Sequence, residues 1–172
     1  MRFRPEPEAA QAAGGRTGVL LCNLGTPDAA TPAATRKYLA EFLSDHRVVE
    51  IPPALWKLIL YAFILPTRPR QSAEKYRSVW LPEGSPLKVY SRRQATMLRG
   101  YLGERGHSVS VRLAMRYGNP SIASQLDALR AEGCTRILVV PLYPQYSGTT
   151  TASVVDAVVQ WAGKARHVPE FR

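Results

Sequence analysis

The chain has 172 residues, of which 45% are hydrophobic and 21% charged, and its formal net charge is +10. These proportions are typical of a globular domain with a real core, and with only two cysteines nothing suggests a disulfide scaffold. The charge favours an anionic partner, but the arginines are scattered in short groups and no run of five basic residues occurs, so nucleic acid is not expected.

Residues 1–15 are polar, alanine-rich and contain prolines, without the apolar segment of a signal peptide. They are expected to form a disordered tail that precedes one domain over residues 16–172. Two cysteines, Cys22 and Cys134, lie in or beside strand-like apolar runs. Such isolated cysteines are expected to be small core residues in a protein of the reducing cytoplasm.

Three short apolar runs predict buried strands, at Val19–Leu24, Ser108–Met115 and Arg136–Leu142. Helical patterns separate them; helices are expected after Thr31, over Ala54–Leu65 and Arg70–Trp80, from Ser85 to about Gly103, from Asn119 to Ala131 and over Thr150–Ala162. This alternation predicts an α/β fold, a parallel sheet with flanking helices, whose ligands bind at the carboxyl ends of the strands. The final letters "KARHVPEFR" are typical of the approach to another strand, so the domain is expected to be incomplete within this chain.

Two of these helices have apolar positions that predict which side faces the core. For the long helix after Ser85 they are Leu87, Tyr90, Gln94, Met97, Leu98, Tyr101 and Leu102. For the last helix they are Val154, Val155, Val158 and Val159.

The loops after the three strands read "NLGTPD", "MRYGNP" and "YPQYSGTTT". None carries the glycine pattern of a dinucleotide or P-loop site. Arg116 could pair with a carboxylate, and Tyr117 and Tyr143 offer flat faces, while Ser147 and the threonines supply donors at a helix start. The set suits a flat apolar ring with acidic edges; the plainer readings are a tight turn, a surface Arg-Tyr pair and a hydroxyl-rich helix cap. The three histidines show no metal-ligand spacing and are expected on the surface: His46, His107 and His167.

The apolar segment Ala54–Leu65 is framed by Pro53 and Pro66. It is shorter than the roughly 20 residues that span a bilayer. Its aromatic residues and the arginines that follow predict an interfacial segment or an apolar lip over a site, and a buried helix is the alternative.

Five collinear motifs resemble the ferrochelatase family, in its proteobacterial form. They read "VLLCNLGTPDAATP…RKYLAEFLSDHRVVEIP", "ILPTRPRQSAEKYRSVW", "GSPLKVYSRRQ", "AMRYGNPS" and "VVPLYPQYSGTTT", and cover nearly everything from Gly18 to about Arg166. The resemblance implies the N-terminal of two similar Rossmann-like domains, the second being absent from this chain. Ferrochelatases insert Fe²⁺ into protoporphyrin IX, bound in the cleft between the domains, to make protohaem in haem biosynthesis.

Matching the family's positions, the resemblance implies porphyrin-binding residues in this chain. They are Leu24, Arg68, Tyr76, Ser85, Arg116, Tyr117, Tyr143 and Ser147. The family's His and Glu, proposed for proton removal or metal delivery, lie in second-domain motifs that this sequence lacks. No catalytic residue, metal ligand or cofactor is therefore expected here, and the chain alone is expected to be inactive. Some members hold a [2Fe–2S] cluster with a Cys in the third loop, but Gly148 stands at that position, so a cluster using this loop is not expected.

The family's lip contacts the membrane in some members, which implies a cytoplasmic protein peripheral to the inner membrane through Ala54–Leu65. Its expected partners are porphyrin and the missing second domain, or a second copy associating through the uncovered cleft. Two other functions remain open: a non-catalytic tetrapyrrole-binding module, and a flavodoxin-like module for an anionic cofactor, against which the missing glycine-rich loop argues.

Overall fold

A four-stranded parallel sheet forms the centre of the computed structural model, which describes residues 3–4 and 15–172. Its strands are β1 (Arg16–Gly25), β2 (Val109–Tyr117), β3 (Cys134–Pro141) and β4 (Glu170–Phe171), in the order β2-β1-β3-β4. The three long strands pair in parallel, as the apolar runs predicted, and β4 is the further strand that the final residues indicated. Most of the expected tail, residues 1–2 and 5–14, lies outside the described residues.

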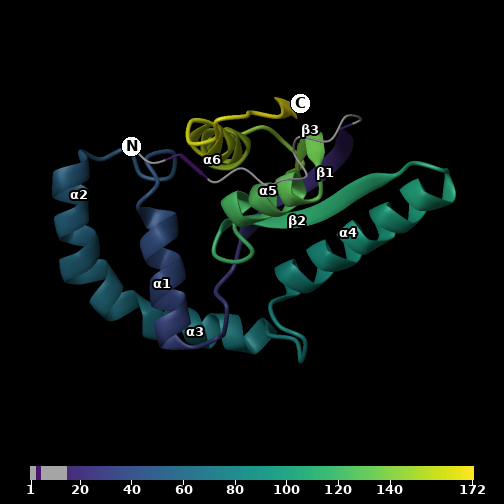
Figure 1. Cartoon of the computed structure of the whole chain (residues 1–172). Helices are drawn as coiled ribbons and strands as arrows, with labels where there is room; N and C mark the ends of the chain where they lie inside the picture. The colour runs from purple at the N-terminus through teal and green to yellow at the C-terminus, as the bar shows by residue number, and fades with distance from the viewer. Residues whose placement is uncertain (1–2, 5–14) are drawn as a thin grey trace.

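Helices cover both faces of this sheet, which confirms the α/β class (Figure 1). The helices are α1 (Pro32–Leu43), α2 (Pro53–Ile59), α3 (Leu65–Val79), α4 (Pro86–Glu104), α5 (Ile122–Ala131) and α6 (Ser153–Ala162), with π-helical segments η2 (Leu60–Ile64) and η3 (Gly148–Ala152). α4 packs on one face, α5 and α6 pack on the other, and α1 to α3 form an arm beside the sheet.

The core has two layers because successive side chains of a strand point to opposite faces of its sheet. Leu20 and Cys22 pack with residues of α5 and α6, whereas Val19 and Leu21 pack with residues of β2 and with Ala95 of α4. The strand β1 is thus buried on both faces, as its apolar run predicted. Cys22 and Cys134 are buried free thiols, which confirms their expected place in the core.

The arm contains one continuous helical run from α2 through η2 to α3, and the break expected at Pro66 does not occur. A proline inside a helix lacks the N–H that would bond one turn back. Here the π-helical segment changes the pattern: the Leu65 N–H bonds to the Leu60 carbonyl, and the Thr67 hydroxyl donates to the Phe63 carbonyl at 2.6 Å. The helix therefore continues past its prolines.

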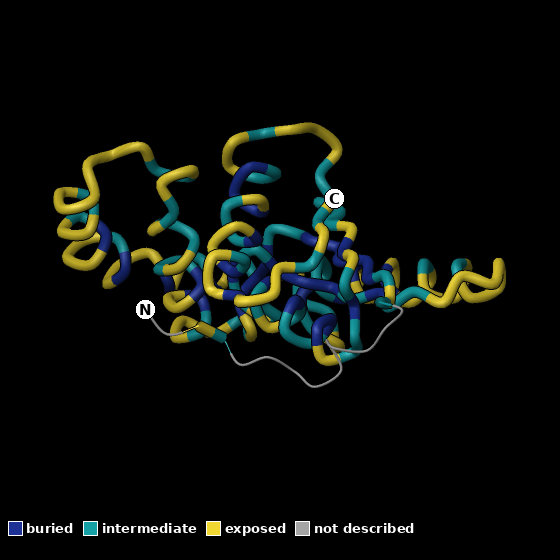
Figure 2. The backbone as a smooth tube through the Cα atoms, turned by 45° about the horizontal axis from the view of Figure 1, so that its top comes forward, coloured by how far each residue is buried: buried dark blue, intermediate teal, exposed yellow. Residues whose placement is uncertain are grey.

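This run leaves much of its apolar surface in contact with solvent (Figure 2). Leu58 and Phe63 are 64% and 66% exposed, while Leu60 is buried and the Trp56 indole donates to the Leu43 carbonyl at 2.6 Å. The prediction that Ala54–Leu65 is helical and partly exposed is confirmed.

The core side predicted for α4 is partly wrong. Tyr90, Met97 and Tyr101 are exposed, whereas Val89 and Ala95 are buried. Small residues such as Ala95 let the helix lie close to the sheet, and this places the larger tyrosines on its outer side. Apolar residues occur at helical spacing on both sides of α4, so their spacing did not show which side faces the sheet.

The last two helices differ from expectation in smaller ways. On α6, Val155 and Val159 are exposed, because each lies one position, about 100°, round the helix from the buried valines. α5 begins at Ile122, two residues after Pro120, because the Ser121 hydroxyl accepts the Ser124 N–H at 3.2 Å and makes Ser121 the cap; the Pro120 carbonyl accepts the Met115 N–H instead.

Candidate functional site

The carboxyl ends of the strands bring several predicted site residues to one edge of the sheet. Leu24 lies at the end of β1, Arg116 and Tyr117 end β2, and Tyr143 follows β3. The ends of β1 and β2 are in close contact, because Gly25 pairs with Tyr117. The φ angle of Gly25 is +112°, and a Cβ atom on this residue would lie 1.8 Å from the Tyr117 carbonyl oxygen. Only glycine fits this approach.

A carboxylate that the sequence analysis did not single out, Asp45, holds this edge together. Its Oδ2 accepts hydrogen bonds from Arg116 Nη2 at 2.5 Å, the Tyr117 hydroxyl at 2.8 Å and the Ser153 hydroxyl at 2.7 Å. The side chains of Arg116 and Asp45 are only 15% and 11% exposed. The pair is therefore a nearly buried ion pair whose carboxylate is fully supported by hydrogen bonds.

The backbone after α1 places Asp45 at this position. Its Oδ1 accepts the Arg47 N–H at 2.8 Å, and the Arg47 guanidinium in turn pairs with Asp156 of α6 at 2.7 Å. Burial raises the pKa of Asp45, but the hydrogen bonds from Ser153, the Arg47 backbone and Tyr117, together with the charge of Arg116, outweigh burial and hold that pKa below its usual value. Asp45 is therefore ionised at neutral pH.

The orientation of Arg116 follows from these partners. Its Nε donates to the Ser153 carbonyl at 2.8 Å and hydroxyl at 2.6 Å, and its guanidinium lies 4.5 Å from the centre of the Tyr117 ring. Nη1 has no acceptor among the described residues. A cavity of about 380 Å³ borders Arg116; its lining also includes Asp45, His46, Arg47, Glu50, Gly148, Asp156 and Gln160.

Aromatic rings connect the arm to the end of β2. Trp80 contacts Tyr76, Tyr76 contacts Tyr38, Tyr38 stacks on Phe42, and Phe42 meets Tyr117 edge-on, with centroid separations of 5.1 to 6.4 Å. Tyr117 is fully buried, and burial raises its pKa to about 12. Its hydroxyl remains protonated at neutral pH and donates to Asp45.

The loop after β3 is held by short polar contacts. The Ser147 hydroxyl accepts the Thr149 N–H at 3.3 Å, which makes Ser147 the cap of η3. The Tyr143 hydroxyl is buried without a partner among the described residues, and burial raises its pKa. The expected helix cap is therefore present at Ser147. The same hydroxyl remains a candidate hydrogen-bond donor to a ligand.

The other predicted site residues lie on the arm and at the start of α4. Arg68 is exposed on α3, Tyr76 is half-buried, and Ser85 is buried at the residue before α4, without a side-chain capping bond. Arg68 is thus exposed whereas Arg116 is enclosed, and their binding to one ligand stays a prediction.

Sequence reasoning missed Asp45 and Ser153. Asp45 precedes Arg116 by 71 residues, and no spacing rule connects positions so far apart. The three histidines are exposed as expected, although His46 borders the cavity beside Arg116. Over residues 3–4 and 15–172 there is no group of three or more His, Cys, Asp or Glu residues placed to hold a metal ion. None of the described helices combines the length and apolarity needed to cross a bilayer.

Comparison with known proteins decides the family, because the ferrochelatase family profile matches residues 16–172. The chain belongs to the ferrochelatase family. It is 65% identical to a ferrochelatase of Polaromonas sp. strain JS666 and 60% identical to one of Methylibium petroleiphilum, in each case over the whole chain. The ferrochelatase of a Janthinobacterium strain is 58% identical.

The chain spans about half the length of these curated relatives, 47–48% of each. The parallel sheet with helices on both faces is the architecture that the family resemblance implied.

Proposed function

We propose that this chain forms one wall of the porphyrin site of a ferrochelatase, the enzyme that inserts Fe²⁺ into protoporphyrin IX to make protohaem. The observation that carries the proposal is the family match over residues 16–172, together with relatives that are themselves ferrochelatases. Iron and porphyrin are substrates here, and a [2Fe–2S] cluster using the Gly148 loop is not part of the proposal.

The chemistry of the described residues supports a porphyrin as ligand. The macrocycle is flat and apolar and carries two propionates. Leu24 and Tyr143 supply apolar surface at the strand ends, and Tyr76 stands at the arm side of the aromatic series that ends at Tyr117. Arginines bind carboxylates through two parallel donors. Arg68, exposed on α3, is the proposed propionate ligand, while Ser85 and Ser147 supply short hydroxyl donors.

Arg116 has a second role in this proposal, because two of its three side-chain nitrogens, Nε and Nη2, already have protein acceptors. Asp45 and Ser153 hold the guanidinium in one orientation, with Nη1 left for a ligand. Contacts at the ring periphery can support distortion of the macrocycle, which exposes a pyrrole nitrogen to the metal. A pre-oriented arginine makes such contacts without a further entropic cost.

The exposed apolar side of Ala54–Leu65 is the proposed membrane contact. Leu55, Leu58, Tyr61 and Phe63 are all more than half exposed on this one helical run. Lys57, Arg68 and Arg70 supply positive charge on the same run, which suits an anionic lipid surface. We infer a protein of the cytoplasm that is peripheral to the inner membrane through this segment.

A fluorescence titration with protoporphyrin IX tests the proposed wall. Arg68→Ala is expected to weaken binding about ten- to hundredfold, the effect of removing one charge-assisted pair. Arg70→Ala is the matched control. Arg70 lies two residues after Arg68 on α3, and its side chain is 88% exposed. Its loss should change the affinity for porphyrin by less than about threefold. Equal affinities for wild type and Arg68→Ala would exclude Arg68 as the propionate ligand. No porphyrin binding by the wild-type chain would overturn the proposed wall.

A further inference from the structure

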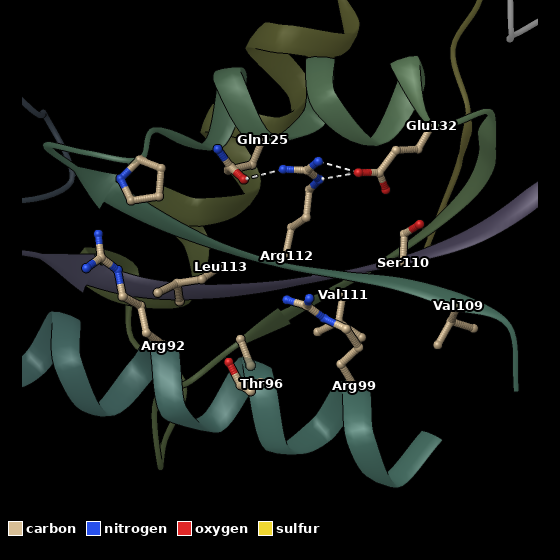
Figure 3. Close-up of a pocket in the computed structure, with 12 residues that line it drawn as sticks. Arg92, Thr96, Arg99, Val109, Ser110, Val111, Arg112, Leu113, Gln125 and Glu132 are labelled. Atoms are coloured by element: carbon tan, nitrogen blue, oxygen red, sulfur yellow. Dashed lines mark hydrogen bonds and ion pairs between the residues drawn. The ribbon is translucent and has the colours of Figure 1, made fainter. Parts of the chain in front are cut away.

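The outer edge of β2 lies open in a groove between α4 and α5 (Figure 3). β2 is the first strand in the sheet order, so only its inner edge pairs with a neighbouring strand, β1. The groove has a volume of about 560 Å³. Its main lining residues are Arg92, Thr96 and Arg99 from α4, Val109 to Leu113 from β2, Gln125 from α5, and Glu132 directly after α5. It shares no residue with the candidate site.

The backbone of β2 presents hydrogen-bonding groups to this groove. The Met115 N–H points outward, because it donates to the Pro120 carbonyl at 2.7 Å. In a parallel strand, the N–H and C=O of one residue point to the same side, and alternate residues point alike. Val111 and Leu113 therefore direct their backbone groups outward as well, and among the described residues these groups have no partner. Residues 120–121 close only the end of the edge at Met115.

The walls of the groove carry unequal charge. Arg92 and Arg99 lie two turns apart on α4, and both point toward β2 (Figure 3). Neither has an acidic partner among the described residues. Arg112 on the floor is already paired, with Glu132 and, at 3.3 Å, with Gln125 of α5. The α4 side therefore keeps two positive charges, whereas the α5 side is nearly neutral.

We propose that this edge binds an extended acidic segment of a partner polypeptide as an added strand beside β2. Val111 and Leu113 both direct backbone donors and acceptors outward, and these groups are roughly 7 Å apart along β2. This spacing matches the two-residue repeat of an added strand, whereas a compact anion is too small to reach both residues. Side chains of an added strand alternate between the two walls. Acidic residues at every second position would therefore face Arg92 and Arg99, and neutral residues would face Gln125.

Binding is tested on the whole 172-residue chain with a fluorescent heptapeptide that alternates glutamate with valine. Three probes are compared by anisotropy: this peptide, the same peptide with lysine for glutamate, and the glutamate peptide with N-methylated backbone amides. The glutamate peptide is expected to bind at least about tenfold more tightly than either of the others, since it alone combines charge complementarity with strand pairing. Hydrogen exchange should show new protection at the Val111 and Leu113 amides when it is bound.

Two charge-reversal variants locate the site. Arg92→Glu with Arg99→Glu should reduce affinity for the glutamate peptide at least about tenfold. Arg36→Glu with Arg93→Glu makes the same change of net charge at exposed positions outside the groove, one of them on α4, and should have little effect. Circular dichroism checks that both variants fold.

Several results would overturn the proposal. Equal binding of the N-methylated peptide would indicate a site for charge alone, as would equal binding of inorganic polyphosphate. An unchanged affinity in the Arg92/Arg99 variant would place the peptide elsewhere. Self-association of the wild-type chain that the Arg92/Arg99 variant abolishes would identify the occupant as a second copy.

Discussion

The guanidinium of Arg116 and the carboxylate of Asp45 lie 2.5 Å apart although 71 residues separate them. Because both groups are nearly buried, removing one leaves the other desolvated and unpaired. Asp45→Asn should therefore lower the free energy of unfolding by about 2–4 kcal/mol, measured by urea denaturation. Asp156→Asn is the control: Asp156 pairs with Arg47 at the surface, and its loss should cost less than about 1 kcal/mol. Equal costs would show that burial adds nothing to the Asp45 pair.

Acid should weaken the same pair. The folded-state pKa of Asp45 lies below its unfolded value, because hydrogen bonds from Ser153, the Arg47 backbone and Tyr117 outweigh the effect of burial. The stability that Asp45 contributes is therefore fully present above the unfolded pKa of about 3.9 and is lost as the pH falls through the folded pKa. Urea titrations from pH 6 downward should show the difference between wild type and Asp45→Asn narrowing below about pH 4. A constant difference across that range would rule out this linkage.

Two glycines should respond in opposite directions to replacement by alanine. Gly25→Ala forces a Cβ atom against the Tyr117 carbonyl at a positive φ, and should destabilise the fold by at least about 2 kcal/mol. Gly100→Ala lies in α4 with nothing within 4 Å of the new Cβ, and should stabilise it by about 0.5–1 kcal/mol. Thermal melts of the two variants measure both effects. A neutral Gly25→Ala would mean that the ends of β1 and β2 can separate without cost.

Vesicle flotation tests the proposed membrane contact. Leu58→Asp with Phe63→Asp places two charges on the exposed apolar side of the arm, and should reduce binding to anionic vesicles about tenfold or more. The control is Tyr90→Asp with Tyr101→Asp, which adds the same charge at similarly exposed positions of α4. This variant should reduce vesicle binding only through the change in net charge. If both variants lose binding equally, the contact is electrostatic and not specific to the arm.

Metal insertion by the chain alone can also be measured. The His and Glu that the family resemblance implies for proton removal or metal delivery belong to motifs not found in these 172 residues, and general-base assistance typically contributes about 10²–10⁴-fold. The chain alone is therefore expected to metallate porphyrin near the uncatalysed rate in an anaerobic assay with Fe²⁺ or Zn²⁺. Turnover like that of a full-length relative would contradict this, and would mean that a homodimer rebuilds the site or that those residues are dispensable.

Much of the fold follows from local patterns. The apolar runs of β1, β2 and β3 are long enough only for strands. The helix expected after Thr31 is present, and Thr31 caps it by accepting the Ala34 N–H, a role typical of a threonine directly before a helix. A parallel sheet follows because helices separate these strands. The residues at the strand ends then share one edge, which is why the loops alone pointed to Arg116 and Tyr143, whereas Leu24 was implied only by the family resemblance.

Only the tertiary structure decided how those residues are partnered. Asp45 reaches Arg116 because the chain after α1 passes the end of β2 and lies beside Ser153 of α6, whose hydroxyl donates to Asp45. Likewise, Ala95 rather than Tyr90 faces the sheet, since close packing selects the smaller side chain. The sequence alone determined which segments form the three long strands and the family to which the chain corresponds, because short apolar runs between helical patterns and collinear motifs are local features. Contacts between distant residues depend on the geometry of packing, which no local pattern encodes.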